Sequence, residues 1–388
     1  MPKSYKKRNL LDLGILVPYL ILSIIGLMMV YSTTSYVMLE EGSNPARQAI
    51  LQFVFWVISL FMMIVIYKMK TSFLKKSWLI NGAMVLITIA LGAAFLFKPV
   101  NGAYGWIQIP SIGTVQPVEF LKFIVIWFLA ATLAKRQGMI QEHFWTSTKR
   151  MVFPLILQLI ILYNYPDLGN AAIIVLLVAV IFLSSGISYL YTLLFGAVSV
   201  GGSVLVISLV NSIGKYFLPS HVIDRFAVFR NPFSDEYGSG HQLIHGYYAM
   251  FNGGLFGRGL GNSIQKKGFL KFAHTDYAFA IVVEELGLIV AIIILGLLFY
   301  MIARMFLIGI RSKDPFNGLM CIGIGSLFLI SVFVNLGGIT GIIPLTGITF
   351  PFISQGGSSL LMFSICVGFT LNISADEKKR MYGLDGYK

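Results

Sequence analysis

The sequence is poor in charged residues and has only two cysteines. Charged side chains make up 12% of its 388 residues, about half the share of an average soluble domain, whereas hydrophobic residues make up 57% and the mean hydropathy is +0.81. Because so little charge cannot cover a soluble protein of this length, the composition predicts a polytopic membrane protein. Cys321 and Cys366 both lie within apolar runs. Their placement gives no support to a disulfide framework or to an activated thiol.

Acidic residues are the scarcer charged type, with 16 Asp and Glu against 29 Lys and Arg, and the formal net charge is +13. In a membrane protein a basic excess gathers at cytoplasmic edges, so it reports orientation and does not indicate nucleic acid as a partner. With the N-terminus inside, the inner segments hold 19 Lys and Arg residues, and the short outer loops hold only Arg47 and Lys98. We therefore expect both termini in the cytoplasm.

The apolar runs predict an all-α fold of about ten transmembrane helices, because roughly 20 apolar residues span the hydrocarbon. The runs lie at residues 13–35, 48–67, 78–97, 117–134, 151–165, 168–185, 189–210, 277–303, 315–336 and 356–373. The fifth and sixth runs meet at Tyr165-Pro166-Asp167-Leu168-Gly169, where Pro and Gly favour a turn and Asp167 can cap the sixth helix. One long kinked span is the alternative.

We expect a single transmembrane domain over residues 1–388, with short cytoplasmic tails at 1–12 and 374–388. One long loop, about 211–276, falls outside the cell and precedes the eighth helix. It is basic and rich in aromatic residues, and a loop of this length is usually either functional or disordered. Its aromatic content argues against disorder, so we expect short helices that line a cavity.

Asp276 stands where this outer loop meets an apolar span. An ionisable residue at such a border is a candidate for function, although Asp276 and Thr275 are also favoured residue types for a helix N-cap. Both interpretations stay open on residue chemistry alone. His274 either orients Asp276 or caps the same helix. Glu284 and Glu285 follow about two turns into the span, where they can pair with basic residues elsewhere.

Glu119 and Lys122 lie three residues apart and so share one face of the fourth span. Opposite charges inside a membrane helix should face the bundle interior and pair. The pair is either structural or in contact with a charged ligand, and both interpretations stay open. Gln116-Pro117 marks the expected start of this helix.

The stretch NGGLFGRGLGNS, at residues 252–263, contains five glycines. Without a preceding strand, tight turns and close backbone packing are favoured over a phosphate-binding loop. Arg258, Lys266 and Lys267 nevertheless supply cations that suit a lipid-linked diphosphate. His241 and His245 have the i, i+4 spacing of some zinc ligands but lack the adjacent Glu, so loop hydrogen bonding is favoured over a metal site.

Five motifs in this order resemble the SEDS family of cell-wall polymerases over residues 13–373, essentially the whole chain. They are NGAYGWIQIPSIGTVQPVEFLKF (101–123), PDLGNA (166–171), DRFAVFRNPF (224–233), GGLFGRGLGNSIQKKGFLKFAHTDYAFAIVVEELGL (253–288) and GIIPLTGITFPFISQGGSSLL (341–361). Within the family, YSTTSY, NGAYGWI and FPFISQGGSS are most similar to the division member, and the elongation member is the alternative. Two departures are Lys271-Phe272, where a Pro-Glu pair is common, and His245, where a glutamine is common.

The resemblance implies a peptidoglycan glycosyltransferase that polymerises lipid II into β-1,4-linked glycan at the outer face of the bacterial cytoplasmic membrane during cell division. Asp276 would be the essential carboxylate and a general base. Arg258, Lys266, Lys267 or a divalent cation, Mg²⁺ or Mn²⁺, would stabilise the undecaprenyl diphosphate leaving group. The remaining residues expected to contact substrate are His274, Thr275, Glu119, Lys122, Gln355 and Ser358.

The implied partners are a class B penicillin-binding protein, which is a transpeptidase, and other division proteins. A flippase for the same lipid-linked precursor is the alternative function, since transporters also use intramembrane charges and interrupted spans. The position of Asp276 at the outer rim, rather than at the membrane midplane, argues against it.

Overall fold

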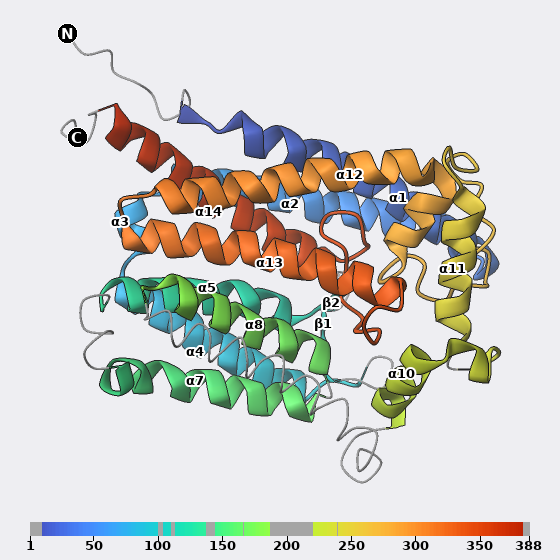
Figure 1. Ribbon diagram of the computed structural model, residues 1–388, viewed down its shortest axis with the longest axis horizontal. Helices are drawn as coiled ribbons and strands as arrows, with labels where there is room; N and C mark the ends of the chain where they lie inside the picture. Colours follow the sequence, from blue (N-terminus) through green and yellow to red (C-terminus); the bar gives the residue numbers. More distant parts are fainter. Residues whose placement is uncertain are drawn as a thin grey trace.

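In the computed structural model the chain forms a bundle of long helices (Figure 1). The structure describes residues 10–99, 104–109, 113–136, 144–165, 167–186, 220–238 and 240–382. Within these ranges seven helices are long and apolar enough to cross a membrane. They are α1 (Leu13–Glu40), α2 (Arg47–Lys68), α4 (Ser77–Ala94), α5 (Pro117–Ala134), α12 (Ala278–Arg311), α13 (Pro315–Ile339) and α14 (Gly357–Met381).

Two further apolar helices, α7 (Phe144–Asn164) and α8 (Leu168–Ser184), match the fifth and sixth predicted spans. The predicted run at 189–210 lies outside the described residues, so the count of ten stays a prediction. The polytopic helical fold itself is confirmed. A small antiparallel pair of strands was not predicted. It consists of β1 (Ile107–Ile109) and β2 (Gly113–Val115), with Gln108 opposite Thr114.

Local sequence signals explain where several helices begin. Pro117 is the first residue of α5, as expected from its missing N–H and fixed φ. The Asp167 side chain accepts a hydrogen bond from the Asn170 backbone N–H at 3.1 Å and caps α8. This cap confirms two separate helices, α7 and α8, in place of one kinked span. Asp314 caps α13 by accepting from the backbone N–H groups of Phe316 and Asn317.

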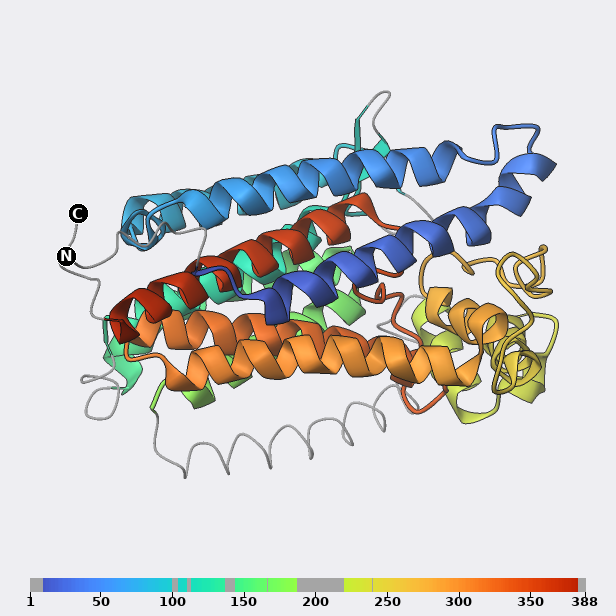
Figure 2. The same cartoon turned by 90° about the horizontal axis from the view of Figure 1, so that it is seen from above.

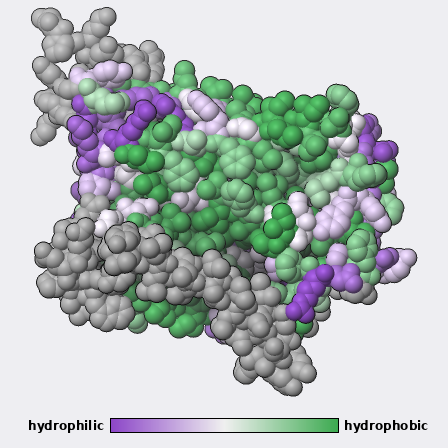
Figure 3. All heavy atoms as spheres, viewed as in Figure 1, coloured by the Kyte–Doolittle hydropathy of each residue, from purple (hydrophilic) through white to green (hydrophobic). Residues whose placement is uncertain are grey.

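Among the seven long helices, α14 is the most buried. It lies in the middle of the bundle between α2 and the pair α12 and α13 (Figure 2). By contrast, α2 and α4 keep large apolar side chains on the outside, among them Phe61 and Leu86. Figure 3 shows hydrophobic side chains across the middle of one face and hydrophilic ones toward the two ends. This distribution is the one that a multi-pass membrane protein requires, since lipid contacts only the middle.

The two ends of the bundle differ in construction. At one end Asp12, just before α1, forms ion pairs with Arg304 of α12 at 3.1 Å and with Lys378 of α14 at 3.4 Å. The short helix α3 (Thr71–Leu74) lies at this same end. At the opposite end lie α10 (Ser220–Arg230), the 3-10 helix Pro232–Asp235 and α11 (His241–Gly253) (Figure 1). These short helices belong to the predicted outer loop.

Candidate active site

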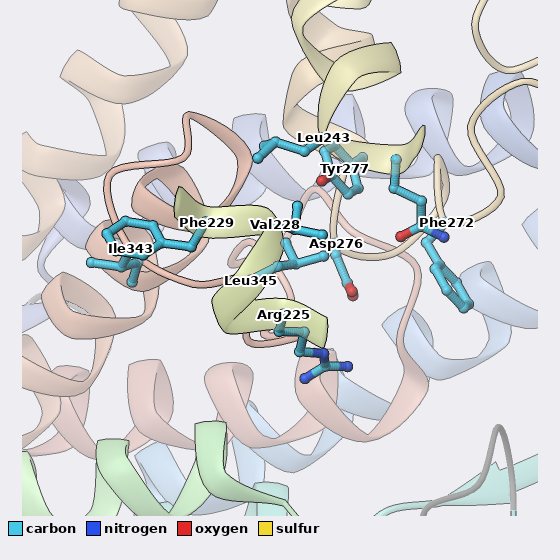
Figure 4. A pocket seen from close by; sticks show the side chains of 11 residues that line it. Arg225, Val228, Phe229, Leu243, Phe272, Asp276, Tyr277, Ile343 and Leu345 are labelled. Carbon is cyan, nitrogen blue, oxygen red and sulfur yellow. The ribbon is translucent and has the colours of Figure 1, made fainter. Parts of the chain in front are cut away.

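A pocket of about 190 Å³ opens at the end of the bundle that carries α10 and α11 (Figure 4). The short helices α10 and α11 form part of its wall, as the sequence predicted for this loop. The residues around it are Arg225, Val228, Phe229, Gln242, Leu243, Phe272, Asp276, Tyr277, Gly338, Ile343 and Leu345. Asp276 is the one carboxylate and Arg225 the one cation in this lining. The pocket thus combines a mostly apolar wall with a single pair of opposite charges.

The backbone around Asp276 is held by three consecutive carbonyl groups. The His274 carbonyl accepts from the Gln355 backbone N–H at 2.8 Å, and the Thr275 carbonyl accepts from the Ser354 hydroxyl at 2.6 Å. The Asp276 carbonyl accepts from the side-chain amide of Asn335 at 2.7 Å. With its backbone tied to α13 and to the turn before α14, the segment can direct the Asp276 side chain into the pocket.

Asp276 is not the N-cap of α12. That position belongs to Tyr277, and no side chain makes a capping hydrogen bond there. The structure therefore contradicts the capping interpretation of Thr275 and Asp276.

Burial raises the pKa of Asp276 to about 6, and the charge of Arg225 together with the Thr275 hydroxyl partly offsets this rise. Figure 4 shows the Asp276 carboxylate pointing toward the Arg225 guanidinium, although the two groups form no ion pair. Burial also lowers the pKa of His274 below its usual value, which favours the neutral imidazole. A carboxylate with a pKa near 6 can take a proton at neutral pH.

Arg225 was not predicted as a site residue. It lies far from Asp276 in the chain, and the sequence pointed to it only through the family motif DRFAVFRNPF, which contains it. Lys271 is also near the pocket, because its ammonium lies 5.7 Å from the ring centroid of Phe272, a lining residue. Of the two, Arg225 is the cation whose charge acts on the Asp276 carboxylate.

Lys266, predicted to contact diphosphate, is instead enclosed in the fold. Its ammonium is 2.6 Å from Glu285 and donates to the Ser32 hydroxyl at 2.7 Å. Glu284 accepts from the Ser263 hydroxyl and from the Ile264 backbone N–H. The structure confirms the predicted pairing with a basic residue for Glu285, whereas Glu284 is held by these hydrogen bonds instead. The pairing anchors the outer loop to α12 and keeps Lys266 out of the pocket lining.

Arg258 and Lys267 are exposed, and neither lines the pocket. The glycine stretch around Arg258 packs against a break in α12 at Gly287, where φ is +85°. The backbone N–H of Arg258 donates to the Glu284 carbonyl at 2.9 Å, and that of Leu288 donates to the Gly254 carbonyl at 3.0 Å. The glycines therefore serve close backbone packing, as the sequence favoured.

The other predicted contact residues also lie outside the pocket lining. Lys122 and Glu119 form a buried ion pair of 2.7 Å within α5. The Gln355 side-chain amide donates to Gln48 at 2.9 Å, and the Ser358 hydroxyl accepts from the Gln116 backbone N–H at 3.0 Å. The role of these residues in substrate binding stays a prediction.

Metal ligands are not gathered in the part of the chain that the structure describes: no three His, Cys, Asp or Glu side chains there are placed to share an ion. The His241 and His245 rings are tilted by 36° with their centroids 4.1 Å apart, and His245 Nδ1 hydrogen-bonds to Gln265 at 2.7 Å. The described residues thus do not fit a preformed site for a divalent cation.

Known proteins match this sequence over almost its whole length. The sequence model of the FtsW, RodA and SpoVE family, described as cell cycle protein, matches residues 13–379. A probable peptidoglycan glycosyltransferase FtsW from Lactococcus lactis is 45% identical over 97% of this chain and 95% of the relative. A protein of the same name from Bacillus subtilis is 36% identical over 96% of this chain and 91% of its own length.

Solved structures share the fold. A chain from a peptidoglycan synthase complex, in a study of how polymerization and crosslinking are coordinated, superposes with a TM-score of 0.72 at 21% identity. The match covers 94% of this chain and 98% of that one. The rod shape determining protein RodA of Thermus thermophilus superposes with a TM-score of 0.65 at 20% identity, over 94% of this chain and 97% of that one. At such identities the likeness concerns the fold.

Proposed function

Because this chain belongs to the family of FtsW, RodA and SpoVE, we propose that it is a peptidoglycan glycosyltransferase that polymerises lipid II during cell division. The observation that carries the proposal is Asp276, the sole carboxylate in the pocket lining, with its pKa raised by burial to about 6. The names of the Lactococcus lactis and Bacillus subtilis relatives support the division role over elongation.

The chemistry we assign to Asp276 is that of a general base. It takes the proton from the 4-hydroxyl of the acceptor sugar while that oxygen attacks the anomeric carbon of the donor. The bond from the anomeric carbon to the diphosphate breaks, and undecaprenyl diphosphate leaves with the electron pair. One displacement inverts the anomeric centre, so an α-linked donor gives a β-1,4 glycan. The apolar lining, with Phe229, Leu243 and Ile343, suits a lipid-linked substrate.

Arg225 is the cation that we place nearest to the departing diphosphate. Its guanidinium is exposed at the pocket and can donate two parallel hydrogen bonds to phosphate oxygens. Arg258 and Lys267 stay proposed contacts for the same group, with Lys271 at the pocket edge, whereas Lys266 is already paired with Glu285. Mg²⁺ or Mn²⁺, if required, would enter with the diphosphate, since magnesium is often bound through substrate phosphates.

We place the protein in the bacterial cytoplasmic membrane with both termini in the cytoplasm. The distribution of Lys and Arg supports this orientation, with 19 on the inner segments. The pocket end, opposite Asp12, then faces outward, where lipid II is consumed. We further propose a class B penicillin-binding protein as partner, together with other division proteins. The resemblance to a chain of a peptidoglycan synthase complex supports a transpeptidase partner.

A polymerisation assay tests the role of Asp276. Purified Asp276→Asn protein, mixed with labelled lipid II and its transpeptidase partner, should make no glycan above background. Glu236→Gln is the matched control, because Glu236 is an exposed carboxylate of the same loop and does not line the pocket. The control should polymerise at the wild-type rate.

Normal glycan synthesis by the Asp276→Asn protein would refute the assignment. Reconstituted vesicles address the flippase alternative. If the wild-type protein moves labelled lipid II across the bilayer and forms no glycan with its partner present, the chain is a transporter and the proposed enzyme activity is wrong.

A further inference from the structure

A second pocket, of about 170 Å³, lies at the end of the bundle opposite the Asp276 pocket. It is formed where the start of α1, the last turns of α12 and the end of α14 come together. Its lining residues are Asp12, Arg304, Leu307, Ile308, Arg311, Lys313, Ser374, Glu377, Lys378, Arg380 and Met381. The proposed glycosyl transfer makes no use of this pocket.

The lining carries five cationic side chains against two carboxylates, an excess of three positive charges. Both carboxylates already have partners. Asp12 is 2% exposed and accepts from Arg304 and from the Ser374 hydroxyl, the latter at 2.9 Å. Glu377 accepts from Ser312 at 2.7 Å and Asn317 at 2.8 Å. Arg304 and Lys378 pair with Asp12, and Arg380 pairs with Glu377 and, outside the lining, with Asp314. The unpaired positive charge is therefore that of the other two cations.

Two of the cations have no anionic partner within the described part of the chain. Arg311, the last residue of α12, and Lys313, just beyond it, are exposed and form no ion pair or hydrogen bond through their side chains with another described residue. They line a concave site and supply its unpaired positive charge. Such an arrangement attracts an anion of about the size of a phosphate.

An apolar strip on α12 leads to this pocket. Tyr300, Leu307 and Arg311 follow at intervals of seven and four residues, so they share one helical face. Tyr300 is 55% exposed and Leu307 is 41% exposed. Met381, which also lines the pocket, is 74% exposed. A ligand with a phosphate and hydrocarbon chains could contact the cations and this strip at once.

We propose that this pocket binds the phosphate headgroup of an anionic phospholipid, with the acyl chains along the exposed face of α12. The location fits, because the pocket lies at a helix end, where the apolar surface of the bundle gives way to charged residues (Figure 3). Basic pockets between transmembrane helices commonly bind such headgroups. Inorganic phosphate offers the same charge but would leave the apolar strip unused.

Lipid binding can be measured by native mass spectrometry of the detergent-purified full chain. Phosphatidylglycerol is compared with phosphatidylcholine of the same acyl chains, and glycerol phosphate is added as a soluble competitor. We expect one tightly held phosphatidylglycerol per chain, little phosphatidylcholine at the same concentration, and no displacement by equimolar glycerol phosphate. The double variant Arg311→Gln with Lys313→Gln should bind phosphatidylglycerol roughly tenfold more weakly or worse, because it loses two cations near the headgroup.

The matched control is Lys68→Gln with Lys70→Gln. It removes the same charge from exposed lysines at the end of α2 that do not line the pocket, and it should keep wild-type lipid binding. Equal losses in both double variants would show a general charge effect and overturn the site. Displacement by glycerol phosphate alone would make it a soluble-phosphate site. Binding of a poly-glutamate peptide without lipid binding would make it a protein-docking site. Either outcome contradicts the proposal.

Discussion

The side-chain amide of Asn335 donates a hydrogen bond of 2.7 Å to the backbone carbonyl of Asp276. The same amide donates at 2.7 Å to the carbonyl of Ile348. One buried residue of α13 thus joins the segment of the proposed base to the segment before α14, which supplies Ile343 and Leu345 to the pocket wall. Asn335 is a positioning residue, since it does not itself line the pocket.

Replacing Asn335 by Ala should lower kcat at least tenfold while changing KM little. The variant leaves two carbonyls without their donor, and each unsatisfied buried group costs about 1–3 kcal/mol, so the Asp276 segment loses its fixed position. Polymerisation kinetics with labelled lipid II provide the measurement, and thermal unfolding monitors the fold. Asn262→Ala is the control, because Asn262 is exposed, its amide donates to the Arg258 carbonyl, and it does not line the pocket. Wild-type kcat in the Asn335 variant would contradict the positioning role.

The polymerisation rate should depend on the ionisation of Asp276. Burial raises the pKa of this carboxyl to about 6, and a general base works only when it is deprotonated. The rate should therefore rise with pH through about 6 and level off above about 7. A pH profile of kcat/KM for the wild-type protein measures this pKa. A rate that stays flat between pH 5 and 7 would show that Asp276 does not titrate there.

Arg225→Gln should shift that pH profile to higher pH. The positive charge of Arg225 lowers the pKa of Asp276, so its removal lets burial act unopposed and the carboxyl holds its proton to higher pH. The maximal rate should also fall, because the diphosphate loses its nearest proposed cation. Arg230→Gln is the control, since Arg230 ends the same helix and does not line the pocket. An unshifted profile would show that Arg225 acts on phosphate alone or not at all.

Charge at position 276 should also affect stability. The pKa of Asp276 is higher in the folded protein than the usual value of 3.8, so the carboxyl favours the folded state when protonated. This contribution is present below pH 4 and is lost as the pH rises through about 6. Asp276→Asn should therefore unfold at the same temperature as the wild type at pH 7, or at a higher one. A thermal unfolding curve of the inactive variant measures this difference, and a lower unfolding temperature would contradict the expectation.

The long helices could be predicted from sequence because each of them needs about 20 consecutive, mostly apolar residues to cross a membrane. Every apolar run in the described residues became a helix, and those that begin at Pro117 and Leu168 start where the proline and the Asp167 cap place them. The strand pair β1 and β2 could not be foreseen, because strands of three residues carry too little alternation to detect.

The site was only partly predictable, since charge alone does not tell which side chains turn inward. Asp276 could be found because it stands at the border of a span. Lys266 and Lys267 look alike in sequence, yet Glu285 pairs with the first and leaves the second exposed. Arg225 lies at the pocket because α10 packs against its wall. Local sequence patterns do not predict such a tertiary contact.

This difference between neighbouring lysines can be measured. Lys266→Met should destabilise the protein by about 3–5 kcal/mol, the usual cost of leaving one member of a buried ion pair unpaired, because Glu285 is fully buried. Lys267→Met, one residue along and exposed, should unfold at the wild-type temperature. Adding Glu285→Gln to Lys266→Met should recover part of the loss by removing the unpaired charge. Equal unfolding temperatures for the two single lysine variants would contradict the structural role of the Lys266 pair.

Gly287 and Gly296 lie in the same helix, α12, but only Gly287 sits at its break. Its φ of +85° disfavours other residues, and a Cβ there would lie 2.4 Å from the Gly257 backbone nitrogen. Gly287→Ala should therefore separate the loop from α12 and lower activity. It should also destabilise the protein by more than the roughly 1–2 kcal/mol that a left-handed backbone alone costs. A Cβ at Gly296 would meet no heavy atom within 4 Å, so Gly296→Ala should be neutral or stabilise by about 0.5–1 kcal/mol. The unfolding temperature and the rate of glycan synthesis are compared for the two variants. Equal values for both variants would show that the loop does not depend on the break in α12.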